Sequence, residues 1–223
     1  MKGNGSLYFN GSSYIDYGAN TSNYATGDFT IEAWTYYNSF TSGYTLWFSM
    51  DPNITYFGPT SATRTVINLG NATELAYTTS AISLSTWYHT AIVRSGTTIT
   101  LYINGVSQGT NTSSATLGNS GGNIRIGSAA GYALNGYLSN VRYTKSAVYT
   151  SAFTPSLYPL TPLANTRLLT AVTSVGTYTD ETGNSTSQTV TGTPTFNSSM
   201  PFQSGIGLQN RVYTWTGSGT VTF

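Results

Sequence analysis

The chain of 223 residues contains no cysteine, and only 8 of its residues are basic and 7 acidic. Without thiols it forms no disulfide, uses no thiolate in catalysis and holds no zinc through cysteine ligands. A formal net charge of +1 creates no long-range field, so neither nucleic acid nor an anionic membrane surface is an expected partner. No stretch approaches the roughly 18 apolar residues of a membrane-spanning helix, so we expect no insertion into a membrane.

Charged residues make up 7% of the chain, whereas about a quarter is usual for a soluble domain. Apolar residues nevertheless account for 39%, and 18 tyrosines, 9 phenylalanines and 4 tryptophans supply the bulk for a core. Disorder caused by low hydrophobicity and high charge is therefore excluded. The length is compatible with one domain or with two small ones.

Several short segments alternate β-branched or aromatic residues with polar ones, which is typical of strands. The clearest are residues 6–9, 29–34 and 98–103. Tight turns are indicated at Asn10-Gly11, Asn104-Gly105 and Asn135-Gly136, because Asn and Gly tolerate positive φ. Residues 91–94 and 99–103 flank Gly96-Thr97 and predict a hairpin. Such closely spaced strands between positions 5 and 145 predict an all-β fold, a two-sheet antiparallel sandwich or jelly roll.

The composition changes after this strand-rich part, where prolines occur at positions 155, 159 and 162. Such a stretch is typical of extended coil on a surface. Further strand-like segments follow at 167–169 and 188–190. We therefore divide the chain into a sandwich at 1–155, a proline-rich connector with strands at 156–202, and a C-terminal extension at 203–223.

Five segments carry a family pattern, in this order along the chain. They are GDFTIEAW at 27–34, WYHTAIVR at 87–94, LYINGV at 101–106, IRIG at 124–127 and GYLSNVRY at 136–143. Together they resemble the laminin-G-like domains of the concanavalin-A-like lectin/glucanase superfamily, over about residues 5–155. The resemblance implies a two-sheet antiparallel jelly roll.

The continuation at 144–155, TKSAVYTSAFTP, is similar to the form of this domain found in structural proteins of tailed phages. Residues 165–202 are similar to a stretch that usually precedes such a domain, although in this chain they follow it. One hypothesis is that their strands complete the same sandwich from the other end, and the other is that they pack as a separate extension. We favour completion, because circular permutation leaves the packed faces unchanged.

Glycoside hydrolysis is the activity that the superfamily suggests, and it needs two suitably spaced carboxyl groups. The glucanases carry them as Glu-x-Asp-x-x-Glu, which does not occur in this sequence. Asp28 and Glu32 are four residues apart, but Asp28 begins the turn-to-strand motif and has a structural role there. His89, the only histidine, is assigned a structural place beside a strand. No Gly-x-Ser-x-Gly, P-loop or dinucleotide motif is present, so we expect that the protein is not an enzyme.

The resemblance also implies calcium at the rim of the sandwich, as in laminin-G-like and pentraxin-like relatives. Asp16 and Asp51, with nearby Asn, Thr and backbone oxygens, are the candidate ligands. Calcium takes about six to eight oxygen ligands, usually including more than one carboxylate, and no acidic cluster marks such a site in the sequence. We expect no other metal and no cofactor.

Aromatic residues crowd between positions 34 and 57, in what the sequence presents as loops and strand ends. Tyrosine with Ser, Gly and Asn is typical of adaptable binding surfaces. Trp34 and Trp87 lie inside strand motifs and are assigned to core or edge packing. The candidate aromatic binding surface consists of Tyr36, Tyr37, Tyr44, Trp47, Tyr56 and Phe57.

These observations predict a non-enzymatic virion protein of a tailed phage, a structural or decoration protein of a capsid or tail lattice. Its partners would be other virion proteins and copies of itself. The alternative is a carbohydrate-binding module that attaches the particle to a host or environmental glycan. The first residues lead into strand-like sequence without an apolar leader segment, so we expect synthesis in the host cytoplasm and incorporation into the virion. Capsid or tail, the glycan and the number of subunits stay open.

The end of the chain has its own pattern. Residues 203–210 are too rich in glycine for a central strand and predict a tether. Two short alternating segments then flank Gly217-Ser218-Gly219 and predict a hairpin, which is marginal in water by itself. We expect this hairpin to bind a neighbouring subunit as an assembly arm, and the alternative is docking on its own domain. The arm would present Tyr213, Trp215, Val221 and Phe223.

Overall fold

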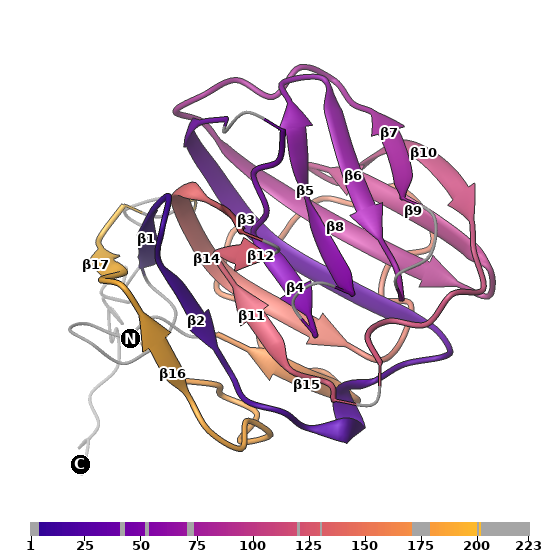
Figure 1. The fold of residues 1–223 in the computed structure, drawn as a ribbon. Coiled ribbons are helices and arrows are strands. Elements are labelled where there is room, and N and C mark those ends of the chain that lie inside the picture. Colours follow the sequence, from indigo (N-terminus) through magenta and orange to yellow (C-terminus); the bar gives the residue numbers. More distant parts are fainter. Residues whose placement is uncertain are drawn as a thin grey trace, which may run out of the picture.

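Two antiparallel β-sheets face each other in this protein, as a computed structural model shows (Figure 1). The structure describes residues 5–40, 43–51, 54–70, 74–119, 121–129, 131–170, 179–199 and 201. Figure 1 looks onto one sheet, which we call sheet B, with the other, sheet A, behind it. The predicted all-β, two-sheet antiparallel sandwich is therefore confirmed.

Neighbouring strands alternate in direction from one edge of each sheet to the other. Sheet A runs β10 (Val106–Thr112), β9 (Thr98–Ile103), β8 (Trp87–Ser95), β3 (Phe29–Ser39), β14 (Asn135–Thr144), β1 (Ser6–Asn10) and β17 (Thr195–Asn197), and β15 (Thr166–Leu169) also pairs with β14. Sheet B runs β16 (Thr189–Thr191), β2 (Tyr14–Asp16), β11 (Ile124–Ile126), β4 (Phe48–Met50), β5 (Thr55–Ser61), β6 (Arg64–Asn68) and β7 (Leu75–Thr78). A small ribbon, β12 (Ser128–Ala129) with β13 (Tyr132–Ala133), and one 3-10 helix, η1 (Thr21–Asn23), complete the described elements.

Strand β3 shows how the sequence builds the core. Phe29, Ile31 and Ala33 are fully buried between the sheets, and the intervening Glu32 points away from them because side chains alternate along a strand. On the neighbouring strand β8, Ile92 lies directly opposite Ile31. Fully burying a large apolar side chain stabilises the fold by about 1.5–3 kcal/mol, so this alternation fixes which face of β3 is inside.

Two of the predicted turns connect neighbouring strands of sheet A, and Asn10-Gly11 (Gly11 φ 85°) follows β1 on the way to β2 of sheet B. The tight turn predicted at Asn135-Gly136 is wrong, because both residues begin strand β14. Gly96 (φ 61°) follows β8 and donates its N–H to Asp28 Oδ1 at 2.8 Å, which confirms the predicted hairpin and the structural role of Asp28. Asn104 (φ 49°) and Gly105 (φ 77°) join β9 to β10. A Cβ atom at Gly105 would collide with the carbonyl of Phe153. Glycine is therefore required there by both the turn and the segment packed on it.

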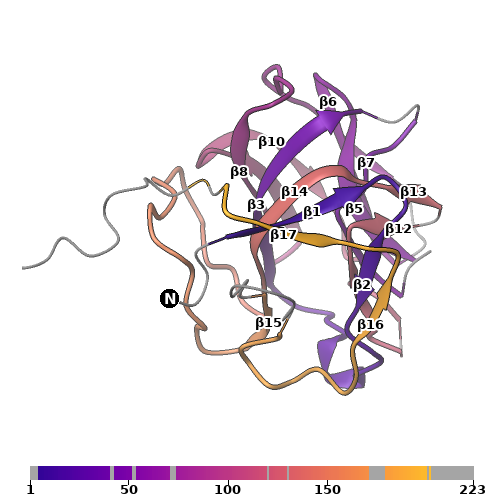
Figure 2. The same ribbon diagram turned by 90° about the vertical axis from the view of Figure 1, so that its left-hand side faces the viewer.

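That packed segment, residues 145–163, runs along the outer face of sheet A (Figure 2), and we call it the strap. The Thr30 hydroxyl donates to the carbonyl of Ser146 at 2.8 Å and accepts from the N–H of Val148 at 2.9 Å. The Phe153 N–H donates to the carbonyl of Gly105 at 3.1 Å. Both faces of sheet A are thus covered along much of β3, β8 and β9. The apolar residues of this second layer are Ala91, Val93, Tyr102, Ala147, Tyr149 and Phe153.

The chain beyond the strap pairs with both sheets. β15 joins β14, with Leu168 opposite Tyr143 and fully buried in the core. β16 lies at the edge of sheet B beside β2, and β17 lies at the edge of sheet A beside β1. Figure 2 shows β16 and β17 at the same end of the molecule. Each sheet therefore gains an edge strand from this part of the sequence.

The residues predicted to form the assembly arm, including Tyr213, Trp215, Val221 and Phe223, lie outside the described residues. Within the described part of the chain, no helix is long and apolar enough to cross a membrane.

Candidate functional site

Three residues of the predicted aromatic surface belong to the core instead. Trp47 and Phe57 are completely buried, and Tyr37 is 1% exposed. The reason is that Tyr37 and Phe57 lie in strands rather than loops: Phe57 on β5 lies opposite Phe48 on β4, and their rings stack 5.4 Å apart. Trp47 immediately precedes β4, and its N–H donates to the Phe57 carbonyl at 3.1 Å. Tyr37, Trp47 and Phe57 therefore cannot contact a ligand at the surface.

Tyr44 and Tyr56 do reach the surface, and Tyr56 lies on the outer face of sheet B because its neighbour Phe57 on β5 faces the core. Both are half-buried, and their ring centroids lie 6.0 Å apart. Tyr132 of β13 joins them, 38% exposed and 4.9 Å from the ring of Tyr44. We call Tyr44, Tyr56 and Tyr132 the tyrosine face. Sequence reasoning missed Tyr132, because the β12–β13 ribbon that presents it has no strand-like periodicity.

Polar side chains border the tyrosine face. Glu74 accepts a 3.0 Å hydrogen bond from the Tyr44 hydroxyl and forms a 3.1 Å ion pair with Arg64. Asn68 Nδ2 lies 3.4 Å from the hydroxyl of Tyr56. The hydrogen bond to Glu74, followed by burial, raises the pKa of Tyr44, while burial and then the charge of Glu74 raise the pKa of Tyr56. Both phenols therefore stay neutral at physiological pH and can donate or accept hydrogen bonds.

Tyr36, the remaining residue of the predicted surface, lies on the opposite side of the molecule. On the outer face of sheet A it forms a cross-strand row with Trp87, Tyr137 and Tyr8. Neighbouring ring centroids along this row are 5.4, 5.2 and 5.1 Å apart, with interplanar angles of 58°, 87° and 42°. The rings thus pack tilted against one another. We call this half-buried set the aromatic row, and it is uncharged.

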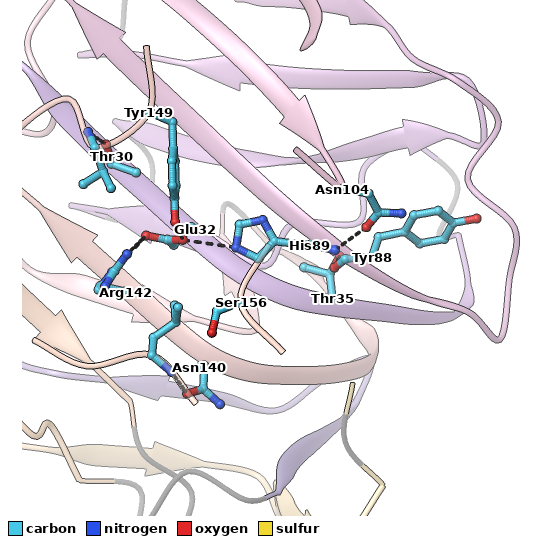
Figure 3. Close-up of polar contacts among 12 residues, drawn as sticks. Thr30, Glu32, Thr35, Tyr88, His89, Asn104, Asn140, Arg142, Tyr149 and Ser156 are labelled. Atoms are coloured by element: carbon cyan, nitrogen blue, oxygen red, sulfur yellow. Dashed lines mark hydrogen bonds and ion pairs between the residues drawn. The ribbon is translucent and has the colours of Figure 1, made fainter. Parts of the chain in front are cut away.

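A buried ionic network lies between sheet A and the strap (Figure 3). At its centre is the fully buried carboxylate of Glu32. Its Oε1 accepts from Arg142 Nε at 2.9 Å, and its Oε2 lies 3.1 Å from His89 Nε2 and accepts from the Tyr149 hydroxyl at 2.8 Å. Arg142 also donates to the carbonyl of Thr161 in the strap at 2.9 Å. The network therefore joins three strands of sheet A to the strap.

The charge of Glu32 is stabilised within this network. Burial by itself would raise the pKa of the carboxyl, but the hydrogen bond from His89 and the charge of Arg142 bring the pKa below its ordinary value. His89 Nδ1 is buried without a hydrogen-bond partner, so the ring's proton belongs on Nε2, facing the carboxylate. With Glu32 and His89 0% exposed and Arg142 4% exposed, the arrangement is inaccessible to a substrate and its role is structural.

The candidate calcium ligands are engaged by N–H donors. Asp51 accepts backbone hydrogen bonds from Asn119, Gly122 and Asn123 at 2.7, 3.2 and 3.0 Å. Asp16 pairs with Arg125 at 3.0 Å and also accepts from Asn123 Nδ2 at 3.1 Å. No group of three or more His, Asp or Glu side chains gathers in the described part of the chain. A calcium ion would have to displace these donors, and its binding stays a prediction.

Comparisons with known proteins agree with this architecture. The family model described as "Concanavalin A-like lectin/glucanases superfamily" matches residues 3–155. A heptameric SAP-like pentraxin from Limulus polyphemus is 16% identical with a TM-score of 0.63, and the match covers 87% of this chain and 95% of that one. A candidate carbohydrate binding protein from Bacteroides ovatus is 15% identical with a TM-score of 0.60, covering 87% of this chain and 62% of that one.

At these identities the two structures show a shared fold alone. No curated protein sequence matches this chain. The family match covers well over half of the 223 residues and includes β1 through β14. The chain belongs to the concanavalin A-like lectin/glucanases superfamily.

Proposed function

We propose that this protein is a non-catalytic module that binds a neutral saccharide on the tyrosine face. The observation that carries this proposal is the grouping of three tyrosine rings on one open face. The ring centroids of Tyr56 and Tyr132 lie 6.0 and 4.9 Å from that of Tyr44, and Glu74 and Asn68 border the group. Aromatic rings present broad apolar faces with polar tips, which suits the alternating C–H and hydroxyl groups of a sugar. Glu74 and Asn68 supply fixed acceptor and donor groups for the hydroxyls.

The family and the shared fold support a binding module. One structural neighbour is described as a candidate carbohydrate binding protein, and the superfamily takes its description from lectins as well as glucanases. Against glycoside hydrolysis, the one carboxylate of β3, Glu32, is buried, and Asp16, Asp28 and Asp51 accept hydrogen bonds from N–H groups of the fold.

The test is glycan-array screening of the folded protein, followed by titration of a captured neutral oligosaccharide. Tyr56→Ala should weaken binding about 2- to 10-fold, since an aromatic contact contributes about 0.5–1.5 kcal/mol. Tyr36→Ala in the aromatic row is the matched control, and it should leave binding unchanged. Binding that is lost in the Tyr36 variant and kept in the Tyr56 variant would move the site to sheet A. A protein that captures no glycan would overturn the proposal.

The second proposal is that the module is carried on the particle of a tailed phage, as a structural or decoration protein of its capsid or tail. The resemblance of residues 144–155 to such proteins supports it. So does the uncharged aromatic row, because it lies opposite the tyrosine face and offers neighbouring virion subunits a separate surface. Mass spectrometry of purified particles should detect several copies of the chain, and cryo-electron microscopy should locate them on capsid or tail. Particles without the chain would refute this placement.

A further inference from the structure

Two open depressions adjoin the 3-10 helix η1. The first, of about 490 Å³, is lined by Thr21, Tyr24, Thr116 and Asn119. The second, of about 460 Å³, is lined by Ser22, Lys145, Asn165 and Arg167. Thr21 and Ser22 are consecutive residues of η1, so this helix contributes to the wall of both depressions.

The second depression holds two cations that have no carboxylate partner. Among the described residues, neither Lys145 nor Arg167 forms an ion pair. This distinguishes them in a protein with so few charges, because three of the other described basic side chains pair with carboxylates and the fourth, Arg94, is buried with its donors on backbone carbonyls. These are Arg64 with Glu74, Arg125 with Asp16, Arg142 with Glu32, and Arg94 with the carbonyls of Gly27 and Ala115.

Hydrogen bonds hold the two cations in place without using all of their donors. Lys145 Nζ donates to the carbonyls of Ser22 and Tyr24 at 3.1 and 2.8 Å, which leaves one of its three N–H groups. Arg167 Nε donates to Asn23 Oδ1 at 3.3 Å. Within the described chain, its two terminal amino groups form no hydrogen bond. A fork of parallel N–H donors therefore faces the depression, and such a fork matches two oxygens of a carboxylate or sulfate.

The acidic side chains near β15, Asp180 and Glu181, form no ion pair with the described residues of this depression. Asp180 lies beside β15 through its bridge with Thr170. Its carboxylate is occupied within the adjoining loop, where it accepts hydrogen bonds from N–H or hydroxyl groups of Leu169, Thr182, Asn184 and Ser185. The adjacent Glu181 is also bonded to β15, through its N–H and the Leu169 carbonyl. In the described part of the chain neither carboxylate forms an ion pair with Lys145 or Arg167, so their positive charge is available to a ligand.

We propose that the two depressions together bind an acidic saccharide. Its anionic oxygens, from a uronate carboxylate or a sulfate ester, lie against Lys145 and Arg167. Its adjoining sugar ring lies against the half-buried ring of Tyr24, with hydroxyls of Thr21 and Thr116 and the Asn119 amide within the same depression. This site shares no residue with the tyrosine face and does not depend on it.

Calorimetric titration of the full chain tests the proposal with four probes. These are a sulfated oligosaccharide, an oligogalacturonate, a neutral oligosaccharide of equal length and inorganic sulfate. We expect one or both acidic oligosaccharides to bind at least about tenfold more tightly than the other two probes, and to bind more weakly as salt is added. Which of them binds identifies the anionic group as sulfate or carboxylate.

Substitutions locate the binding. Arg167→Gln should lower the affinity about tenfold or more, because hydrogen bonds to charged groups are the stronger ones. Arg167→Lys keeps the charge but loses the fork, so an intermediate loss is expected. Tyr24→Ala should weaken binding of the oligosaccharide but not of inorganic sulfate. Arg125→Gln is the control, since it removes the same charge from a cation already paired with Asp16. Thermal melting verifies that each variant is folded.

Three outcomes would overturn the proposal. In the first, neither acidic oligosaccharide binds. In the second, Arg125→Gln weakens binding as much as Arg167→Gln does, which would indicate general charge attraction. In the third, inorganic sulfate binds as tightly as the oligosaccharides and Tyr24→Ala has no effect, which would indicate a simple ion site. None of these results bears on the tyrosine face, which the Tyr56 variant and neutral glycans test separately.

Discussion

The hydroxyl of Tyr149 donates a 2.8 Å hydrogen bond to the buried carboxylate of Glu32, 117 positions earlier in the chain. The same tyrosine ring stacks on Phe153 with centroids 3.6 Å apart, and Phe153 lies edge-on to His89 at 5.6 Å. The strap is therefore held to sheet A by a charged hydrogen bond inside an aromatic layer.

Removing that hydroxyl should destabilise the fold. Tyr149→Phe keeps the ring but leaves one oxygen of a buried carboxylate with fewer donors, so we expect the free energy of unfolding to fall by about 1.5–3 kcal/mol. Urea denaturation measures the change. Tyr158→Phe, at a strap position that is 57% exposed, is the matched control and should change stability by less than about 0.5 kcal/mol. Equal effects of the two variants would mean that the bond to Glu32 does not hold the strap.

The network should also make stability depend on pH. The pKa of Glu32 is lower in the folded protein than its ordinary value. The contribution of Glu32 to the free energy of unfolding is therefore fully present above the pKa of the carboxyl in the unfolded chain, about 4.3. It is lost as the pH falls through the lower pKa that the carboxyl has in the folded protein. We expect the free energy of unfolding to decrease on acidification below about pH 4.3.

The variant Glu32→Gln isolates this contribution. It should be less stable at pH 7 by about 3–5 kcal/mol, because Arg142 keeps its buried charge without a carboxylate to balance it. Its free energy of unfolding should depend less on pH below about 4.3 than that of the wild type. Denaturant titrations between neutral and acidic pH would contradict this assignment if both proteins lost stability with the same slope.

Truncation after Pro162 should prevent correct folding. It removes β15, whose Leu168 is fully buried, and both edge strands β16 and β17. β1 and β2 would then become unprotected edges, which promote aggregation, so we expect insoluble protein on expression. A truncated chain that stays soluble and melts like the full one would show that residues 163–223 are an appendage.

Deletion of residues 203–223 should have the opposite effect. These residues lie outside the described part of the structure, and we predict that they form an assembly arm. The melting temperature of the sandwich should stay nearly unchanged, while self-association in analytical ultracentrifugation, or incorporation into particles, should weaken. Normal assembly of the deletion variant would refute the arm, and collapse of the variant would favour docking on its own domain.

The sandwich itself was predictable because its strands carry local signals. The alternation at 29–34, the Gly96 turn and the Asn104-Gly105 turn each depend on neighbouring residues alone. The buried or exposed state of the aromatic residues was harder to predict. The sequence around Trp47 and Phe57 is typical of loops and strand ends, and it does not show that Phe57 lies on the inner face of β5 or that Trp47 packs beside it just before β4. An inner strand face differs from a loop only once the register is known.

The sites depend on contacts between distant parts of the sequence. Arg142 and Glu32 are 110 positions apart, and neither segment indicates that the other will lie opposite it. The same holds for Lys145 and Arg167, which line one depression from different elements. Tyr44 and Tyr56 could be proposed from composition, but their partner Tyr132 depends on where the β12–β13 ribbon packs.

The pairing of β1 with β17 has a consequence for how this domain can be mounted. Because Ser6 lies opposite Asn197 and its hydroxyl donates to the Ser199 carbonyl at 2.6 Å, the two ends of the described chain emerge side by side. The chain therefore enters the sandwich before Ser6 and leaves it after Ser199 at one corner. Such a domain can be inserted into a surface loop of a host protein without separating the ends of that loop, and it would then be held by two covalent attachments instead of one.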